Sequence, residues 1–440
     1  MTTVWRFCRV LLDRKSTRGK KTLLLGVLLM AAFVYKACHD QMGPAATEDV
    51  DMSWAEKEKC PACFGDTYEL LHRGNFATVR PESGRSWKKG IVSTGKIGDV
   101  QVIAKTLSDA VGWKRYEKFI CRSSARPKEC NPSSFIIETT LVTDVALKIP
   151  FLRGSWRISR PEKSVLPVCL SDRFLKEVKK LYVGKETTEM TNDDLIGRAF
   201  LSTSLLINEE AVLLRYFTTK SPTPWPFPKF YGACGRVIVV EHAGRMLDTF
   251  IESPWKVRAD IAVQLLQLVD TLRQKDPDWI LFSLDVTFQN FAVDIRGRVR
   301  LIDFDDVLVI DRQTVVNHQE EDGTCNEPCY MDFQKKLFFS DQYQCEDILK
   351  YTPMMYANVC ARILSDLQKH PEWRKWGQIK EYIDGQNVKW APTDKGLLHD
   401  APDEIRGPLE GALGQCVEET HPGGRLNAVM TLQKILRMTF

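Results

Sequence analysis

The sequence predicts an α+β protein of two lobes, one rich in β-strands and one helical, and three observations support this. Residues 60–107 contain short alternating apolar runs that are typical of strands. Residues 255–272 repeat apolar side chains with the 3.6-residue period of a buried helix. The tail from 340 to 440 is mostly helical in pattern. We therefore expect a strand-rich lobe at 60–240, which contains cysteines and an insertion, and a helical lobe at 241–440.

The composition is that of a folded globular chain. Of the 440 residues, 44% are hydrophobic and 27% are charged, which excludes a disordered chain, a collagen and a polytopic membrane protein. The net charge is +4, and residues 1–21 alone carry seven basic residues and one acid. The remainder is therefore close to neutral, and we expect no nucleic-acid binding.

The N-terminal segment has the pattern of a targeting sequence. A basic tail at 1–21 precedes a run at 22–35 without any charge, which is short for a full membrane span of roughly 20 residues. This pattern fits a signal anchor or the apolar region of a signal peptide, and a short Golgi-type anchor is favoured over a cleaved signal. A polar, acidic stem follows at 36–59. By the positive-inside rule the rest of the chain enters the lumen, so we expect a Golgi or secreted protein that meets the membrane through this segment.

The cysteines fit an oxidising compartment. Of thirteen in the chain, eleven follow Cys38, so at least one stays unpaired if the rest form disulfides. We expect Cys234 to be the free one, because it lies in an apolar, strand-like run. The Cys60-Pro-Ala-Cys63 motif is interpreted as structural, with a redox motif and half a zinc site as alternatives. The sequence leaves the pairing open, and the disulfide candidates are Cys60, Cys63, Cys121, Cys130, Cys169, Cys325, Cys329, Cys345, Cys360 and Cys416.

The strand lobe contains two predicted strand pairs and a helix. Residues 91–94 and 100–107 predict a hairpin, since a Gly-Lys-Ile-Gly turn separates them. Residues 209–217 have helical apolar spacing, and four prolines end this helix. Residues 230–231 and 237–240 then predict two strands around a glycine turn.

The helical lobe begins with a long helix and a strand pair. The helix at 255–272 is expected to be buried, because its apolar positions recur on one face. Residues 291–293 and 299–302 predict two short strands, joined by the turn sequence at 294–297. The helix leads into a segment at 281–290, which we interpret as a loop.

That loop and the segment after the strand pair have the spacing of a catalytic centre. Asp285 and Asn290 form an Asp-x4-Asn motif, and Asp303 lies 18 positions after Asp285. In phosphoryl transfer, one aspartate faces the acceptor hydroxyl while an asparagine and a second aspartate hold Mg²⁺ or Mn²⁺. We therefore predict that Asp285 is catalytic and that Asn290 and Asp303 bind metal. The alternative is a pair of Asx-type turns flanking a hairpin.

The strand lobe supplies candidates for nucleotide binding. Lys105 ends an alternating strand, as the phosphate-binding lysine of kinases does, and Glu210 or its neighbour Glu209 opens the helix that would pair with it. The alternatives are an edge lysine in solvent and a helix-start carboxylate favoured by the dipole. Glu241 ends a strand whose backbone would bond adenine, and Gly74 lies in what resembles half of a glycine-rich loop.

Together these features resemble the divergent protein kinase domain family of secretory-pathway proteins, in particular its second branch. The resemblance covers nearly the whole expected luminal part and is carried by residues 59–65, 225–236, 254–255, 284–293 and 397–400. It implies a protein-kinase-like fold, residence in the Golgi or secretion, and a role in secretory trafficking or extracellular signalling. For an active kinase we expect ATP with Mg²⁺ or Mn²⁺ as cofactor and a luminal or extracellular protein or glycan as substrate, and for a signalling factor a cell-surface receptor as partner.

Several positions depart from the kinase pattern. Ser283-Leu284 stands where kinases have His-Arg, Asp305 replaces the glycine after Asp-Phe, and no Ala-Pro-Glu follows. Lys105 and Glu210 are much farther apart than in ordinary kinases, so an insertion lies between them. Three hypotheses stay open: an active luminal kinase, an inactive pseudokinase in signalling or trafficking, and a disulfide-rich module unrelated to kinases.

Overall fold

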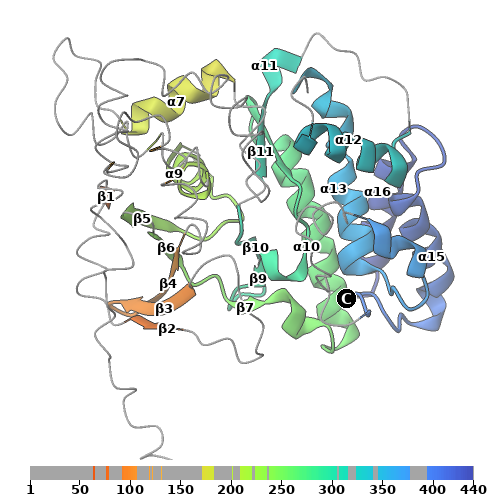
Figure 1. Ribbon diagram of the computed structural model, residues 1–440. Coiled ribbons are helices and arrows are strands. Elements are labelled where there is room, and N and C mark those ends of the chain that lie inside the picture. The colour runs from red at the N-terminus through yellow and green to blue at the C-terminus, as the bar shows by residue number, and fades with distance from the viewer. Residues whose placement is uncertain are drawn as a thin grey trace, which may run out of the picture. The chain divides into compact units, whose positions relative to one another are not determined.

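Figure 1 shows a computed structural model of the chain. It describes residues 92–106, 171–182, 209–220, 223–234, 237–304, 307–315, 324–339, 345–376 and 394–439, the short stretches 63–64 and 76–78, and the single residues Lys118, Cys121, Cys130 and Leu201. The chain divides into two units, Met1–Val50 and Asp51–Phe440, and all described residues belong to the second. The predicted targeting segment and stem, as well as Gly74, Asp305, Cys60 and Cys169, therefore lie outside the described residues. No helix in the described ranges is both long and apolar enough to cross a bilayer.

A six-stranded antiparallel sheet forms the core of the strand-rich part. The predicted hairpin and the predicted pair before the long helix are both confirmed, and they meet in this sheet because β4 pairs with β6. The strand order is β1-β5-β6-β4-β3-β2. The bounds are Cys63–Phe64 for β1, Phe76–Thr78 for β2, Val92–Ile97 for β3, Val100–Thr106 for β4, Phe230–Cys234 for β5 and Val237–Glu241 for β6.

The alternation predicted for β4 is present. Val102 and Ala104 are fully buried on one face of the sheet, whereas Ile103 and Lys105 lie on the other face and are only partly buried. Lys105 is central in the sheet, because β3 and β6 pair with β4 on its two sides. The solvated edge position considered as an alternative for Lys105 is therefore wrong.

One helix packs on this sheet, and a second helix packs on the first. α9 spans Glu210–Lys220, which confirms the predicted helix and extends it by three residues. α7 spans Asp172–Tyr182 and contacts α9. An aromatic cluster joins both helices to the strand that precedes Asp285. The Phe174 ring lies edge-on to Tyr216 and to Trp279, and the Trp279 indole donates a hydrogen bond of 3.1 Å to the Tyr216 hydroxyl.

The long helix α10, Trp255–Gln274, organises the helical part and confirms the predicted buried helix. Figure 1 shows β9 and β10 on one side of α10 and α13 and α16 on the other, in agreement with the contacts between these elements. α13 is Met354–Val359 and continues as a π-helix at Cys360–Leu364. The remaining longer helices are α12 (Glu327–Phe339), α15 (Asp403–Val417) and α16 (Gly424–Arg437). The shorter helices are η3 (Leu247–Phe250), η4 (Phe288–Asn290), α11 (Arg312–Val315), η5 (Cys345–Tyr351) and η7 (Pro371–Lys375).

Two small sheets lie between the large sheet and the helices. The first has the order β10-β9-β7, with β7 at Arg245–Met246, β9 at Phe291–Val293 and β10 at Val299–Leu301, and it confirms the predicted strand pair. The second pairs β8, Trp279–Ser283, with β11, Val307–Asp311. The sequence did not reveal this pair, because both strands are buried at every position and therefore show no alternation.

Three disulfides link cysteines that the sequence offered as candidates: Cys121–Cys130, Cys325–Cys329 and Cys360–Cys416. The Cα atoms of these pairs are 5.6, 5.3 and 6.3 Å apart, which is the usual range for a bridge. The backbones of Cys63 and Cys234 are partners across β1 and β5. The side chains of Cys63, Cys234 and Cys345 are not among those described.

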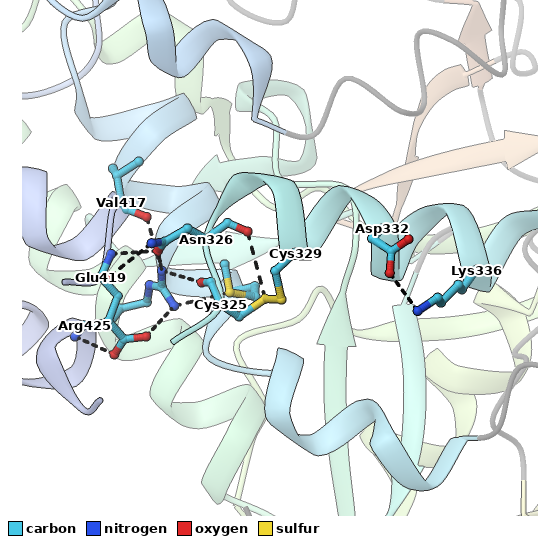
Figure 2. The surroundings of a disulfide bond; sticks show 9 residues. Cys325, Asn326, Cys329, Asp332, Lys336, Val417, Glu419 and Arg425 are labelled. Atoms are coloured by element: carbon cyan, nitrogen blue, oxygen red, sulfur yellow. Dashed lines mark hydrogen bonds and ion pairs between the residues drawn. A yellow bond between two sulfur atoms is a disulfide. The ribbon is translucent and has the colours of Figure 1, made fainter. Parts of the chain in front are cut away.

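A buried arginine joins two of these bridges, as Figure 2 shows for the one at Cys325. Arg425 is 1% exposed, and its guanidinium donates to the carbonyls of Cys325, at 2.9 Å, and Cys416, at 2.8 Å. Glu419 balances its charge at 3.2 Å. Burial lowers the pKa of Arg425, and the nearby Glu419 opposes this effect. The starts of α12 and α16 and the end of α15 are thereby fastened together.

Candidate active site

Lys105 lies between two carboxylates that come from distant parts of the chain. Its Nζ is 2.8 Å from Glu210 Oε2 and 2.7 Å from Asp303 Oδ1. The side chains of Lys105, Glu210 and Asp303 are 18%, 1% and 20% exposed, so the cluster is mostly shielded from water. Of the two adjacent glutamates, Glu210 is therefore the one that pairs with Lys105. Charge-assisted contacts of this length fix the lysine firmly in position.

Each member of the cluster is placed by its own element. The pleat of β4 turns Lys105 away from the fully buried face. Glu210 occupies the first turn of α9, where the helix dipole favours a negative charge. Asp303 follows β10, and its neighbour Phe304 is fully buried, with its ring edge-on to Phe227 at 4.6 Å. The strand that carries Lys105, the helix that begins with Glu210 and the Asp303-Phe304 segment thus meet at one point.

The loop that contains Asp285 and Asn290 is closed by its own hydrogen bonds. Asn290 Nδ2 donates to the Asp285 carbonyl at 2.9 Å, and the Ser283 hydroxyl donates to the same carbonyl at 3.3 Å. Asp285 and Asn290 are 8% and 6% exposed. The Asn290 carbonyl accepts the Ile302 N–H at 2.9 Å. Because Ile302 precedes Asp303, the loop is joined directly to the cluster around Lys105.

The side-chain oxygens of Asn290 and Asp303 are of the kind that a hard divalent cation prefers. Because Nδ2 of Asn290 is used by Asp285, Oδ1 is the amide atom left to serve as a ligand. Carboxylate and amide oxygens suit Mg²⁺ and Mn²⁺, which usually keep waters or phosphate oxygens as further ligands. Among the described side chains, no group of three or more His, Cys, Asp and Glu gathers around a point. A cation at Asn290 and Asp303 would therefore depend on phosphate or water for the rest of its coordination.

Glu241 is placed at the end of β6, beyond the strand position that pairs with Lys105. Its described hydrogen bonds run to Lys229: the Glu241 N–H donates to the Lys229 carbonyl at 2.8 Å, and Oε2 accepts the Lys229 N–H at 3.2 Å. The next N–H, of His242, donates to the Gln101 carbonyl at 3.0 Å. The Glu241 side chain is thus directed toward the entry of β5, whereas Lys105 contacts Glu210 and Asp303.

A second charged cluster, around Arg173, could not be predicted from the sequence. Arg173 of α7 contacts Asp311 at the end of β11, with Nε to Oδ2 at 3.0 Å, and Asp278 before β8, with Nη1 to Oδ1 at 2.7 Å. Its guanidinium also lies 4.0 Å from the Trp279 ring centre. Burial alone would raise the pKa of Asp311, but hydrogen bonds from Arg173 and Ser171 outweigh it and hold the pKa below its ordinary value. No spacing signal links residues so far apart in the chain.

Comparison with known proteins gives a consistent result. Residues 202–419 match a family described as the protein-kinase domain of FAM69, and this range includes Glu210, Asp285, Asn290 and Asp303. The chain is 29% identical to Divergent protein kinase domain 2A of Mus musculus and of Homo sapiens, over 98% of both chains in each case. It is 27% identical to human Divergent protein kinase domain 2B, over 58% of this chain and 60% of that protein.

Proposed function

We propose that this chain, which belongs to the divergent protein kinase domain family, transfers a phosphoryl group from ATP to a hydroxyl of a luminal or extracellular protein or glycan. The observation that carries the proposal is the position of Lys105, whose ammonium contacts both Glu210 and Asp303. A lysine held by a helix carboxylate beside a metal-binding aspartate is the arrangement that positions ATP phosphates. The Asp285–Asn290 loop is joined to it through Ile302.

Each residue has a separate role in this reaction. Lys105 binds phosphate oxygens while Glu210 holds the lysine in place. Asp285 orients the acceptor hydroxyl and takes its proton as the acceptor oxygen forms a bond to the γ-phosphorus and the bond to ADP breaks. Asn290 and Asp303 would hold Mg²⁺ or Mn²⁺, which when bound neutralises charge on the phosphate oxygens. Asp303 must then leave Lys105, and the lysine retains Glu210 while it turns to the nucleotide.

The location of the acceptor follows from the N-terminal segment. A basic tail before an apolar run directs the rest of the chain to the lumen, so the substrate would be met in the Golgi or outside the cell. The hydroxyl-bearing partner is therefore a secreted protein, a glycan or the luminal face of a membrane protein. The membrane itself is contacted through residues 22–35.

The second candidate function is that of an inactive pseudokinase, which would act as a secreted signalling factor or a trafficking partner. The observation that favours it is the short ion pair between Lys105 and Asp303, because it occupies an oxygen that a metal requires. In addition, Ser283 and Leu284 replace the His-Arg that precedes the catalytic aspartate in kinases. In this function the Lys105 cluster serves the fold alone.

Nucleotide binding separates the two functions. Full-length protein is heated with ATP and Mn²⁺, with ATP alone and with Mn²⁺ alone, and the variants Asp303→Asn and Asp260→Asn are compared. Asp260 is exposed on α10 and provides a matched change of charge away from the site. At a ligand concentration of 100 times Kd, binding stabilises the native state by about 2.7 kcal/mol.

The active kinase predicts a rise in melting temperature that needs ATP and Mn²⁺ together, persists in Asp260→Asn and disappears in Asp303→Asn. Transfer of labelled phosphate from ATP to a secreted-protein extract should show the same dependence. Equal melting temperatures with and without ATP and Mn²⁺ would contradict the proposal and leave the pseudokinase.

A further inference from the structure

The strand pair beside the candidate site has one end at the site and the other end away from it. β8 leads into Asp285, and β11 follows shortly after Asp303. The two strands are antiparallel, and Trp279 and Asp311 are partners at the end that lies away from these two aspartates. A contact at that far end therefore fixes the direction of both strands, and with it the path of the chain into the site.

The helix α9 also has a site end and a far end. Glu210 in its first turn contacts Lys105, while Tyr216 and Phe217 in its second half contact α7. Successive side chains on a helix point about 100° apart, so Tyr216 faces a different side of α9 from Glu210. A rotation of α9 by about 100° would exchange Glu210 for Glu209 beside the lysine. The contacts at the far end therefore bear on which glutamate meets Lys105.

Two adjacent residues of α7 join both far ends. Figure 1 shows α9 between α7 and β5, in agreement with the contacts between these elements. The Phe174 ring lies edge-on to Tyr216 of α9 at 4.9 Å and to Trp279 of β8 at 5.0 Å. Arg173 forms a bidentate pair with Asp311 of β11, with Nε to Oδ2 at 3.0 Å and Nη2 to Oδ1 at 2.5 Å. Because both guanidinium contacts must align, such a pair fixes orientation as well as distance.

The bidentate pair is buried on its strand side. The Asp311 side chain is 2% exposed and that of Arg173 is 31% exposed. The same carboxylate accepts the Ser171 hydroxyl at 2.7 Å and the Gln313 N–H at 3.0 Å. Asp278, which contacts Nη1 of the guanidinium at 2.7 Å, is by contrast 45% exposed. If α7 moved away from β11, a buried carboxylate would lose its cation, so the position of α7 is strongly specified.

We propose that Arg173 is a positioning residue: it fastens α7 to the far end of β8 and β11, and α7 in turn fixes α9 in the rotation that keeps Glu210 on Lys105. Kinases control this lysine–glutamate pair through the position of the glutamate helix, often by phosphorylation of the activation loop. In this chain, contacts within the fold position the helix. The consequence for phosphoryl transfer rests on the proposed function, whereas the effect on the contact between Lys105 and Glu210 does not.

The effect on this contact is measured by NMR on full-length protein labelled with ¹⁵N at the lysine ζ position. The Lys105 signal is identified by its loss in Lys105→Met, and Glu210→Gln shows where the signal moves when the contact is broken. The test variant combines Arg173→Met with Asp311→Asn, so that no buried charge is left without its partner. We expect the Lys105 signal of this paired variant to move in the same direction as in Glu210→Gln.

The matched control removes an exposed arginine–aspartate pair on α15, through Arg406→Met with Asp403→Asn, and should leave the Lys105 signal in place. An unmoved Lys105 signal in the paired variant, or an equal shift in the control, would overturn the inference even if the melting temperature falls. If the paired variant does not fold, Arg173→Lys is measured instead, because lysine keeps the charge but not the bidentate contact. Its Lys105 signal should move less far in the same direction, and an unmoved signal would again overturn the inference.

In an active enzyme, the kinetics distinguish a positioning role of Arg173 from a purely structural one. Because Lys105 holds the phosphates, a positioning role predicts that the paired variant raises the KM for ATP roughly 10-fold. A purely structural role lowers the fraction of folded protein, so kcat falls while the KM for ATP stays unchanged, and this result would contradict the inference. If the unaltered protein transfers no phosphate, the proposed function fails, and the NMR result still decides the inference.

Discussion

Replacing Lys105 with methionine should destabilise the fold, because this side chain is the shared cation of Glu210 and Asp303. Methionine keeps the length and most of the packing of lysine but removes the charge. Two carboxylates, one of them 1% exposed, would then face each other without the ammonium between them. Like charges so close together in a shielded site repel, and burial makes each carboxylate harder to keep ionised.

The magnitude follows from the geometry. At an effective dielectric constant of about 20, contacts of 2.8 and 2.7 Å each correspond to roughly 6 kcal/mol of attraction before desolvation. Removing one partner of a fully buried pair costs about 3–5 kcal/mol net. Lys105 and Asp303 are about one-fifth exposed, so water screens part of this interaction. We expect a loss of about 2–4 kcal/mol.

The assay is urea unfolding of the full-length protein. Lys180→Met is the matched control, because Lys180 is 66% exposed and pairs with Glu177 on the helix surface; it should cost less than about 0.5 kcal/mol. In a double-mutant cycle, Glu210→Gln should relieve part of the Lys105→Met loss, with a coupling energy of about 1–3 kcal/mol. A Lys105→Met protein whose free energy of unfolding lies within about 0.5 kcal/mol of the unaltered one, or a coupling energy of zero, would show that Lys105 does not stabilise the two carboxylates.

Three other properties can be predicted from the described contacts. The pKa of Asp311 in the folded protein lies below its unfolded value of about 3.9, so its contribution to stability is present above that pH and is lost as the pH falls through the folded pKa. Asp311→Asn should therefore flatten the fall in melting temperature between pH 5 and pH 3. An unchanged slope of melting temperature against pH would contradict this. Replacing Cys360 and Cys416 with alanine opens a bridge between residues 56 positions apart and should cost about 4 kcal/mol in urea unfolding, against no loss if the bridge is absent. Gly244→Ala should lower the melting temperature strongly, because φ is +112° there and a Cβ would lie 2.1 Å from the Val293 carbonyl oxygen; a stable alanine variant would show that β7 and β9 approach each other less closely.

The sequence predicted the type of an element correctly where the element has a regular apolar pattern and buries only one face. β4 and α10 each bury one face, so their alternation and 3.6-residue period predicted their type correctly. β8 and β11 are buried on both faces, and a continuous apolar run does not distinguish strand from helix. The sequence therefore predicted β4 and α10 but not β8 and β11.

The same distinction holds for the candidate site. The Asp-x4-Asn spacing is local, so it could be found in the sequence, but the choice between Glu209 and Glu210 depended on the rotation of α9 relative to β4. The structure resolves it through the contact between Lys105 and Glu210.

Interactions between distant residues left no mark in the sequence. Arg425 binds main-chain carbonyls, which any residue type offers, so nothing in the sequence marks its partners. The Tyr330–Asn358 pair joins two helices through a single hydrogen bond. Disulfide pairing was equally hidden, because it depends on which cysteines the fold brings together.

The proposed function requires that Lys105, Glu210, Asn290 and Asp303 form one nucleotide and metal site. This site can be measured by isothermal titration of the full-length protein with a non-hydrolysable ATP analogue at saturating Mn²⁺. We expect one saturable binding event per chain, which is absent without Mn²⁺, absent in Asp303→Asn and at least tenfold weaker in Lys105→Met, a loss of about 1.4 kcal/mol. Binding that is equally strong in all three proteins, or no heat of binding in the unaltered protein, would contradict it.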